Sequence, residues 1–190
     1  MNTPWAGRLE AVGRAQERYL WFLLFAGVFY AALGVRVDEA GAMPLPFVGI
    51  ELASAIVWAT GPAVISFIVL VIHGTLRAAK TAEMKLEKVD RAIPFEAYDR
   101  APNAIDLAVY TSEGVPAWLQ QVLFLSYPFY LGVFVLEAGL LLGAYWTGRP
   151  PGVWWLVGAV ASTALWGAAA VTTLWLFWAR VKRVFRRPAA

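Results

Sequence analysis

Glu137 is the residue whose type and position most clearly suggest chemistry. It is a carboxylic acid within an apolar run from about Val122 to Trp146. A charge near the middle of a membrane-spanning helix costs at least about 2.5–3.5 kcal/mol, so an acid there is treated first as a functional residue. No Lys or Arg occurs at that depth in the other apolar runs. Because loss of water penalises the charged form, we expect this acid to hold a proton at neutral pH.

Hydroxyl side chains accompany the acid. At about 100° per residue, Ser126 and Tyr130 fall on the helical face of Glu137. Depth matching with the neighbouring runs adds further hydroxyls. The predicted intramembrane polar seam contains Glu137, Tyr130, Ser126, Tyr30, Thr60, Ser162, Thr163 and Thr173. Such a seam is either a proton or ion path or a set of interhelical hydrogen bonds worth about 0.6–2 kcal/mol each. The second interpretation is the simpler one, because hydroxyls alone are poor ion ligands.

Small residues at four-residue spacing indicate close helix packing. Gly139 and Gly143 form a G-x-x-x-G step on a different face from the acid, and Gly158 and Ser162 form a second step. Small residues let helix backbones approach closely in lipid. We expect one face to pack within the chain and another to contact a neighbouring copy.

His73 is the single histidine and lies one helical turn from Arg77. Its side chain could titrate near neutral pH and act as an interface switch. The alternative is a hydrogen-bonded histidine at the membrane interface, which is the more ordinary role.

The sequence contains no other pattern of catalytic or cofactor-binding residues. It has no cysteine and one histidine, which argues against thiolate chemistry and an ordinary zinc site. It has no glycine-rich phosphate loop, G-x-S-x-G or H-E-x-x-H motif. We therefore expect no enzymatic activity, no cofactor and no metal.

The elements that position these residues are apolar helices. The chain has 190 residues, 60% of them hydrophobic and 15% charged, with a mean hydropathy of +0.59. Soluble domains are nearer one quarter charged. A helix needs roughly 20 apolar residues to cross a bilayer. We predict an all-α integral membrane four-helix bundle in one domain, 1–190, with spans at about 19–35, 52–77, 122–146 and 153–178.

The placement of basic residues predicts the orientation. All but two of the sixteen Lys and Arg residues lie in the N-terminal arm, in the connection 78–118 with Arg77 just before it, or in the C-terminal tail. The exceptions are Arg36 and Arg149. Because cytoplasmic connections carry the excess of basic residues, both termini are predicted to be cytoplasmic.

The connection 78–118 is the largest part outside the spans. Apolar residues recur at three- and four-residue steps up to about Asp90, which predicts that the second span continues as an amphipathic cytoplasmic stalk. Pro94 and Pro102 then break the helix, and a short helix is expected at 104–110. This connection could pack within the protein or dock a protein partner.

One segment resembles a known family. The run Leu45-Pro46-Phe47-Val48-Gly49-Ile50-Glu51-Leu52, followed by Gly61-Pro62 and His73, is similar to the membrane region of bacterial membrane-anchored pentapeptide-repeat proteins. This chain contains no five-residue repeats. The resemblance implies a membrane module and transfers no catalytic residue.

These observations favour a non-enzymatic, homo-oligomeric membrane module whose stalk docks or relays to a partner. The alternatives are a small oligomeric ion or proton channel or carrier that uses Glu137, and an accessory subunit of a larger membrane complex. The expected location is the bacterial inner membrane, with multiple passes. Expected partners are lipids, other copies and a protein at the cytoplasmic connection; no nucleic acid is expected, because juxtamembrane charge accounts for the basic tail.

Overall fold

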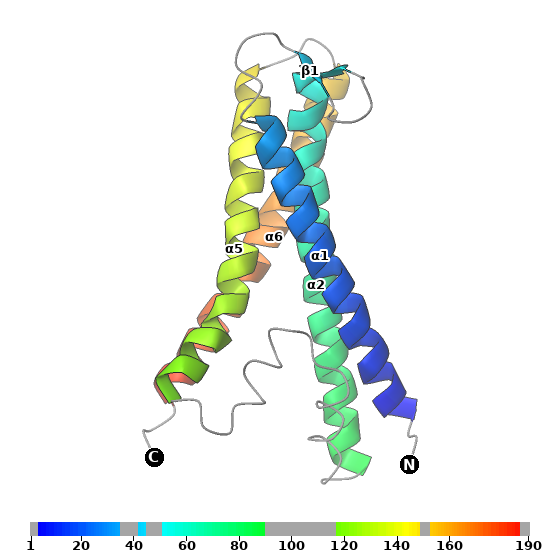
Figure 1. Cartoon of the computed structure of the whole chain (residues 1–190), viewed down its shortest axis with the longest axis vertical. Helices are drawn as coiled ribbons and strands as arrows, with labels where there is room; N and C mark the ends of the chain where they lie inside the picture. The colour runs from blue at the N-terminus through cyan, green and yellow to red at the C-terminus, as the bar shows by residue number, and fades with distance from the viewer. Residues whose placement is uncertain (1–3, 35–41, 45–50, 90–116, 149–152, 187–190) are drawn as a thin grey trace. The chain divides into compact units, whose positions relative to one another are not determined.

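The structure, a computed structural model, is built from long helices (Figure 1). It describes residues 4–34, 42–44, 51–89, 117–148 and 153–186. Within these ranges the elements are four helices and two short strands: α1 (Pro4–Gly34), β1 (Ala42–Pro44), β2 (Glu51–Ala53), α2 (Ser54–Val89), α5 (Ala117–Gly148) and α6 (Val153–Arg186).

Three of these helices are long and apolar enough to cross a membrane, judged over the described residues. The qualifying stretches are Trp58–Ala82 in α2, with a mean hydropathy of 1.8, Leu125–Gly148 in α5, with 1.6, and Val153–Lys182 in α6, with 1.5. They overlap the spans predicted at 52–77, 122–146 and 153–178. The chain therefore has the helices expected of a membrane protein.

The predicted first span, 19–35, falls mainly in the second half of α1. Within the described residues, α1 is not among the helices that qualify by length and composition. Its first half carries Arg8, Arg14 and Arg18, which leaves Tyr19–Gly34 as its uncharged part. A membrane crossing by α1 stays a prediction.

The second span begins differently from the prediction. Leu52 lies in β2, which pairs antiparallel with β1 in the register Met43↔Leu52, and α2 starts only at Ser54. A short apolar run at the end of a helix cannot be distinguished from a strand by its pattern alone. This is why the prediction placed Leu52 in the helix.

Past its apolar stretch, α2 continues as one helix to Val89. Pro62 lies inside α2 and Pro128 inside α5. Proline is tolerated in membrane helices because neighbouring groups satisfy the freed backbone carbonyls. The predicted short helix at 104–110 lies outside the described residues.

The chain forms two compact units, and each helix contributes to both. Unit 1 comprises Met1–Trp21, Val71–Tyr130 and Thr173–Ala190, and unit 2 comprises Phe22–Leu70 and Leu131–Thr172. The two units are described separately below.

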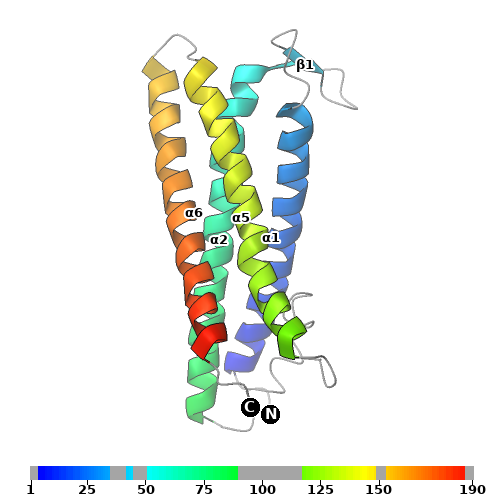
Figure 2. The same ribbon diagram turned by 90° about the vertical axis from the view of Figure 1, so that its left-hand side faces the viewer.

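In unit 2, α5 packs against both α1 and α6. Gly27 of α1 lies against Phe134 of α5, and Gly139 of α5 lies against Trp166 of α6. Figure 2 shows α5 between these two helices. The side chains buried in this unit come from all four helices and include Leu23, Leu33, Ile65, Val69, Leu131, Ala138, Leu142 and Ala159.

Large apolar side chains of unit 2 also remain exposed. Phe25 of α1 is 67% exposed, while Leu136 and Leu140 of α5 are 70% and 78% exposed. On α6 the exposed side chains include Val160 and Val171. Contiguous apolar surface of this kind marks contact with a membrane or with another protein.

Unit 1 has a smaller apolar core with polar groups inside it. Ile72 of α2 and Tyr127 of α5 are buried together with two polar side chains, Gln16 of α1 and Thr173 of α6. Buried polar groups are costly unless they are hydrogen-bonded. Their partners are therefore part of the description of the site.

Candidate functional site

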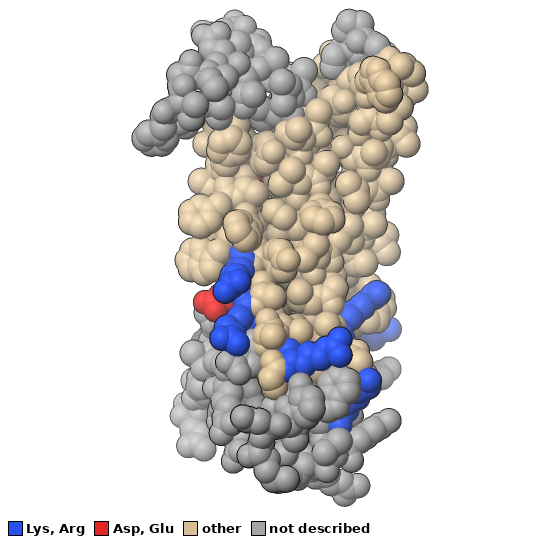
Figure 3. All heavy atoms as spheres, turned by 90° about the vertical axis from the view of Figure 1, so that its right-hand side faces the viewer, with Lys and Arg blue, Asp and Glu red and all other residues tan. Residues whose placement is uncertain are grey.

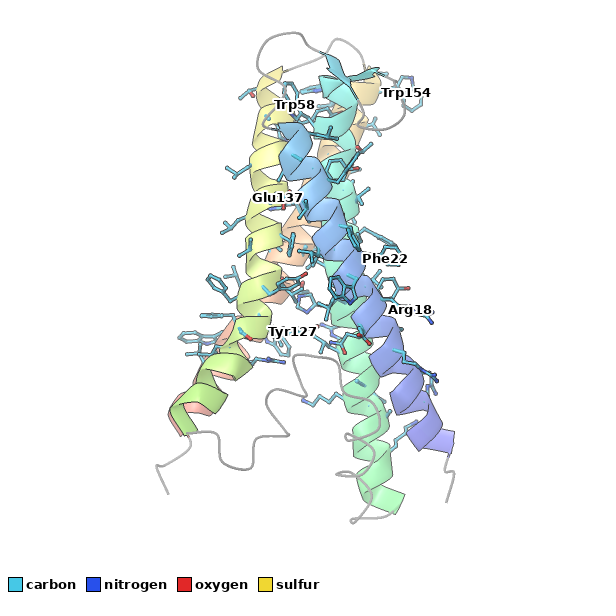
Figure 4. The ribbon with its side chains drawn as sticks, viewed as in Figure 1. Arg18, Phe22, Trp58, Tyr127, Glu137 and Trp154 are labelled. Atoms are coloured by element: carbon cyan, nitrogen blue, oxygen red, sulfur yellow. The ribbon has the colours of Figure 1, made fainter. Side chains whose placement is uncertain are left out.

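Glu137 lies on α5 within unit 2, beside α1 (Figure 4). A methyl group added at Gly27 would lie 2.9 Å from Oε2 of Glu137, so this oxygen sits close to the backbone of α1. The other carboxyl oxygen, Oε1, is buried and has no hydrogen-bond partner among the described residues. An unpartnered buried oxygen is rare in proteins and calls for an explanation.

Gly27 is what allows α1 to come this close. The same added methyl would overlap the ring of Phe134, so any larger residue at this position must displace the ring or separate the helices. The sequence interpretation did not include Gly27. A glycine within an apolar run shows that close approach is possible, but it does not show which helix approaches.

The predicted hydroxyls of unit 2 have other partners. Tyr30 Oη donates a hydrogen bond to Thr60 Oγ1 at 3.1 Å, which joins α1 to α2. Ser162 Oγ donates to the carbonyl of Ala59 at 3.4 Å, which joins α6 to α2. None of these hydroxyls partners Oε1 of Glu137.

Thr163 completes this set on α6. Its hydroxyl donates to the carbonyl of Ala159 at 2.7 Å and accepts a bond from Trp146 Nε1 at 3.1 Å. The structure therefore arranges the hydroxyls of unit 2 as separate interhelical or local hydrogen bonds, and it leaves the acid outside them.

The two glycines of the G-x-x-x-G step have different surroundings. At Gly139 an added methyl would lie 3.1 Å from Nε1 of Trp166, whose indole donates to the carbonyl of Val135 at 2.9 Å. At Gly143 nothing lies within 4 Å. Gly139 thus packs within the chain, while Gly143 faces open space.

The second predicted packing step, formed by Gly158 and Ser162 on α6, contacts other residues of the same chain. A methyl at Gly158 would lie 3.0 Å from the hydroxyl of Tyr145, which itself donates to the carbonyl of Trp155 at 3.1 Å. Ser162, one turn further along α6, bonds to Ala59 as described above.

The remaining predicted residues belong to unit 1. His73 Nε2 and Thr173 Oγ1 are hydrogen-bonded at 3.1 Å and join α2 to α6. Tyr130 Oη donates to the carbonyl of Leu20 at 3.1 Å and joins α5 to α1. Ser126 lies on the same stretch of α5 and is half-buried. The predicted seam is therefore divided between the two units.

Sequence reasoning missed one polar group of unit 1. Gln16 is 3% exposed, and its Nε2 donates to the hydroxyl of Tyr127 at 2.6 Å. The guanidinium of Arg180 lies over the same tyrosine ring, 5.1 Å from its centroid. Stacking of a cation on an aromatic face is favourable. These residues were missed because their residue types are common near the ends of membrane helices, so the sequence alone does not single them out.

Charge is concentrated in unit 1. Every Lys and Arg with a described side chain belongs to this unit, and the blue side chains visible in Figure 3 are among them. Within the described part of unit 2 there is no Lys, Arg or His. No basic side chain is therefore available there to neutralise Glu137. Among all described residues, no three His, Asp or Glu side chains gather closely enough to hold a metal ion.

No protein family, curated protein or solved structure matches the chain. The resemblance to membrane-anchored pentapeptide-repeat proteins therefore rests on the quoted residues alone. Residues 45–50 of that segment lie outside the described part of the structure.

Proposed function

We propose that this chain is a non-enzymatic, multi-pass module of the bacterial inner membrane that associates with copies of itself. Its membrane location is supported by the three apolar helices α2, α5 and α6. We include α1 as a fourth crossing, because its uncharged half exposes Phe22, Phe25 and Val28. In lipid these side chains are well solvated, whereas in water they would favour aggregation.

The proposed orientation has both termini in the cytoplasm. In α1 the basic residues end at Arg18, and in α2 and α6 they begin at Arg77 and Arg180. Each of these three helices thus carries its basic residues toward one end. The positive-inside rule assigns that end to the cytoplasm. The continuation of α2 to Val89 would then be a cytoplasmic stalk, available to a protein partner.

Self-association is proposed to use the exposed face of α5 in unit 2. This face presents Leu136 and Leu140 between two glycines, Gly132 and Gly143, which have nothing within 4 Å. Hydrophobic attraction between helices is absent in lipid, so helices associate where small residues permit close packing. The open space at Gly143 is the observation that carries this proposal.

The test is Gly143→Leu, compared with Gly167→Leu. Both glycines lie in membrane helices and have nothing within 4 Å, but Gly167 is on α6. We expect crosslinking in lipid vesicles to show oligomers for the unchanged protein and for Gly167→Leu, and mainly monomers for Gly143→Leu. Monomers in all three samples would refute self-association, and equal oligomers in all three would refute the proposed face.

A second candidate function is a proton or ion carrier that uses Glu137. The observation in its favour is the buried Oε1, which has no partner among the described residues. Acids within membrane helices are typical components of proton relays. The test is proton flux into liposomes that contain the protein, with Glu137→Gln as the comparison. Flux that depends on Glu137 would support this role, and the absence of flux in both samples would refute it.

A further inference from the structure

We infer that Glu137, at the contact between α1 and α5, is a reversible proton-binding site that is open to the lipid and takes no calcium or magnesium ion. The inference deepens the second candidate function by naming its ion. It rests on three observations from unit 2: the carboxyl oxygen without a partner, the space left by Gly27, and the lack of other ligands.

The first observation concerns charge. Oε1 is buried without a partner, and the described part of unit 2 contains no basic residue. The other ionisable groups with described side chains in this unit are Tyr30 and Tyr145, and both hydroxyls donate elsewhere. An ionised Glu137 would have no compensating charge in the described part of unit 2, so a proton is the species that completes the site.

The second observation is the room at Gly27. Oε2 lies where a side chain of α1 would otherwise stand, and the ring of Phe134 packs against the same glycine. The missing side chain thus lets the acid lie against the α1 backbone.

The third observation separates a proton from a metal cation. A calcium ion takes six to eight oxygen ligands, and a magnesium ion completes an octahedral shell with several waters. Here the backbone carbonyls are part of helices, and the predicted hydroxyls Tyr30, Thr60 and Ser162 are engaged with one another or with Ala59. One carboxyl group in an apolar helix contact, away from water, offers too few ligands for either ion, but it is sufficient for a proton.

Access to the site is from the side of the helix. Phe25 and Val28 of α1, on either side of Gly27 in the sequence, are 67% and 60% exposed. If α1 crosses the membrane, these side chains face lipid on the helix that the acid contacts. An apolar reagent dissolved in the bilayer should therefore reach Glu137 more readily than a water-soluble reagent.

The experiment is modification of the full chain in phosphatidylcholine vesicles by dicyclohexylcarbodiimide, an apolar carbodiimide. A protonated carboxyl adds to the reagent: its oxygen bonds to the central carbon, and its proton moves to nitrogen. Transfer of the acyl group from oxygen to nitrogen then gives a stable N-acylurea that retains every atom of both reactants. Mass spectrometry of peptides identifies the modified residue.

The expected result is modification at Glu137 that is strong at low pH. It should fall by about tenfold for each pH unit above the midpoint, as for any single acid. A water-soluble carbodiimide should leave Glu137 unmodified. Glu137→Gln is the negative control, because it lacks the carboxyl group, and circular dichroism verifies that its helices are retained. No modification of Glu137 at any pH, or equal reaction with the water-soluble reagent, would overturn the inference.

Two further measurements test which ion binds at Glu137 and whether the site serves proton transport. Excess calcium or magnesium at constant pH should not protect Glu137, and protection would show that a divalent cation occupies the site, which overturns the assignment. Modification without proton flux would leave this site standing and remove the carrier function. Flux that persists in Glu137→Gln, without modification of Glu137 in the unchanged protein, would refute this site and not transport itself.

Discussion

At the residue scale, the close contact between Gly27 and Phe134 sets the distance between α1 and α5 in unit 2. The glycine has no room for even one methyl group, because that methyl would overlap the phenylalanine ring and crowd Oε2 of Glu137. Packed interiors accommodate extra volume poorly, and an added methylene typically costs about 1–3 kcal/mol.

Gly27→Ala is therefore expected to destabilise the fold by about 1–3 kcal/mol, despite the better helix propensity of alanine. The measurement is thermal unfolding in detergent, followed by circular dichroism. The matched control is Gly167→Ala, where nothing lies within 4 Å, so a neutral or slightly stabilising effect is expected. Equal melting temperatures for both variants would contradict the described contact.

Tyr127→Phe tests the polar contact inside unit 1. Loss of the hydroxyl removes the acceptor of the 2.6 Å bond from Gln16 and leaves a buried amide without this partner. An unsatisfied buried donor costs about 1–3 kcal/mol, so the melting temperature should fall. Tyr19→Phe is the control, because no hydrogen bond of Tyr19 occurs among the described residues. A loss as large in the control would show that the Gln16 bond contributes nothing specific.

The sequence could identify Glu137 because an acid within an apolar run is visible without any knowledge of packing. Its surroundings could not be identified in the same way. Whether Gly27 or Tyr30 lies beside the acid depends on a shift of one helical turn between α1 and α5, and span limits are not known to that accuracy. Prediction of the hydrogen bond between Gln16 and Tyr127 would also have required the register of α1 against α5, two helices that are far apart in the sequence.

At the element scale, the apolar runs predicted the three qualifying helices, and the ends of these helices were less predictable. The β1–β2 pair was not predicted, because three-residue strands have too few residues to show an alternating pattern. The G-x-x-x-G step was also ambiguous: the spacing alone could not show that Gly139 packs against Trp166 while Gly143 stays open.

The pairing of α2 with α6 can be tested by a disulfide, because the chain has no native cysteine. Ser162 Oγ reaches the carbonyl of Ala59 at 3.4 Å, so the two backbones are close in unit 2. Ala59→Cys combined with Ser162→Cys should form an intramolecular disulfide on oxidation, seen as faster migration on a non-reducing gel.

The control for this pairing is Ala59→Cys combined with Ala161→Cys. Ala161 is the residue before Ser162, but it is exposed on another face of α6. This pair should stay reduced within one molecule, since a disulfide requires the two Cα atoms within about 7 Å. Efficient intramolecular crosslinking of both pairs would show that α6 rotates freely and would contradict the described contact.

At the scale of the whole molecule, the account depends on lipid as the solvent of the apolar helices. Exposed leucine, phenylalanine and valine side chains on α1, α5 and α6 would be unfavourable in water, and the basic residues lie toward the ends of α1, α2 and α6. The same distribution of charge predicts the orientation. Composition therefore indicates the solvent and charge predicts the sidedness, whereas the proposed self-association face depends on which glycines remain open.

Sided labelling of single cysteines tests this central claim most directly. Lys85→Cys and Lys182→Cys place a thiol at exposed positions in the basic ends of α2 and α6. Thr147→Cys places one at an exposed position near the C-terminal end of α5. Val28→Cys places one in the uncharged half of α1. Each variant is treated with a membrane-impermeant maleimide in right-side-out and in inverted vesicles of bacterial inner membrane.

We predict that Lys85→Cys and Lys182→Cys react only in inverted vesicles, that Thr147→Cys reacts only in right-side-out vesicles, and that Val28→Cys reacts in neither. Reaction of all four variants in the same vesicles, or a chain that leaves the membrane in alkaline carbonate, would contradict a protein that crosses lipid with its basic ends in the cytoplasm.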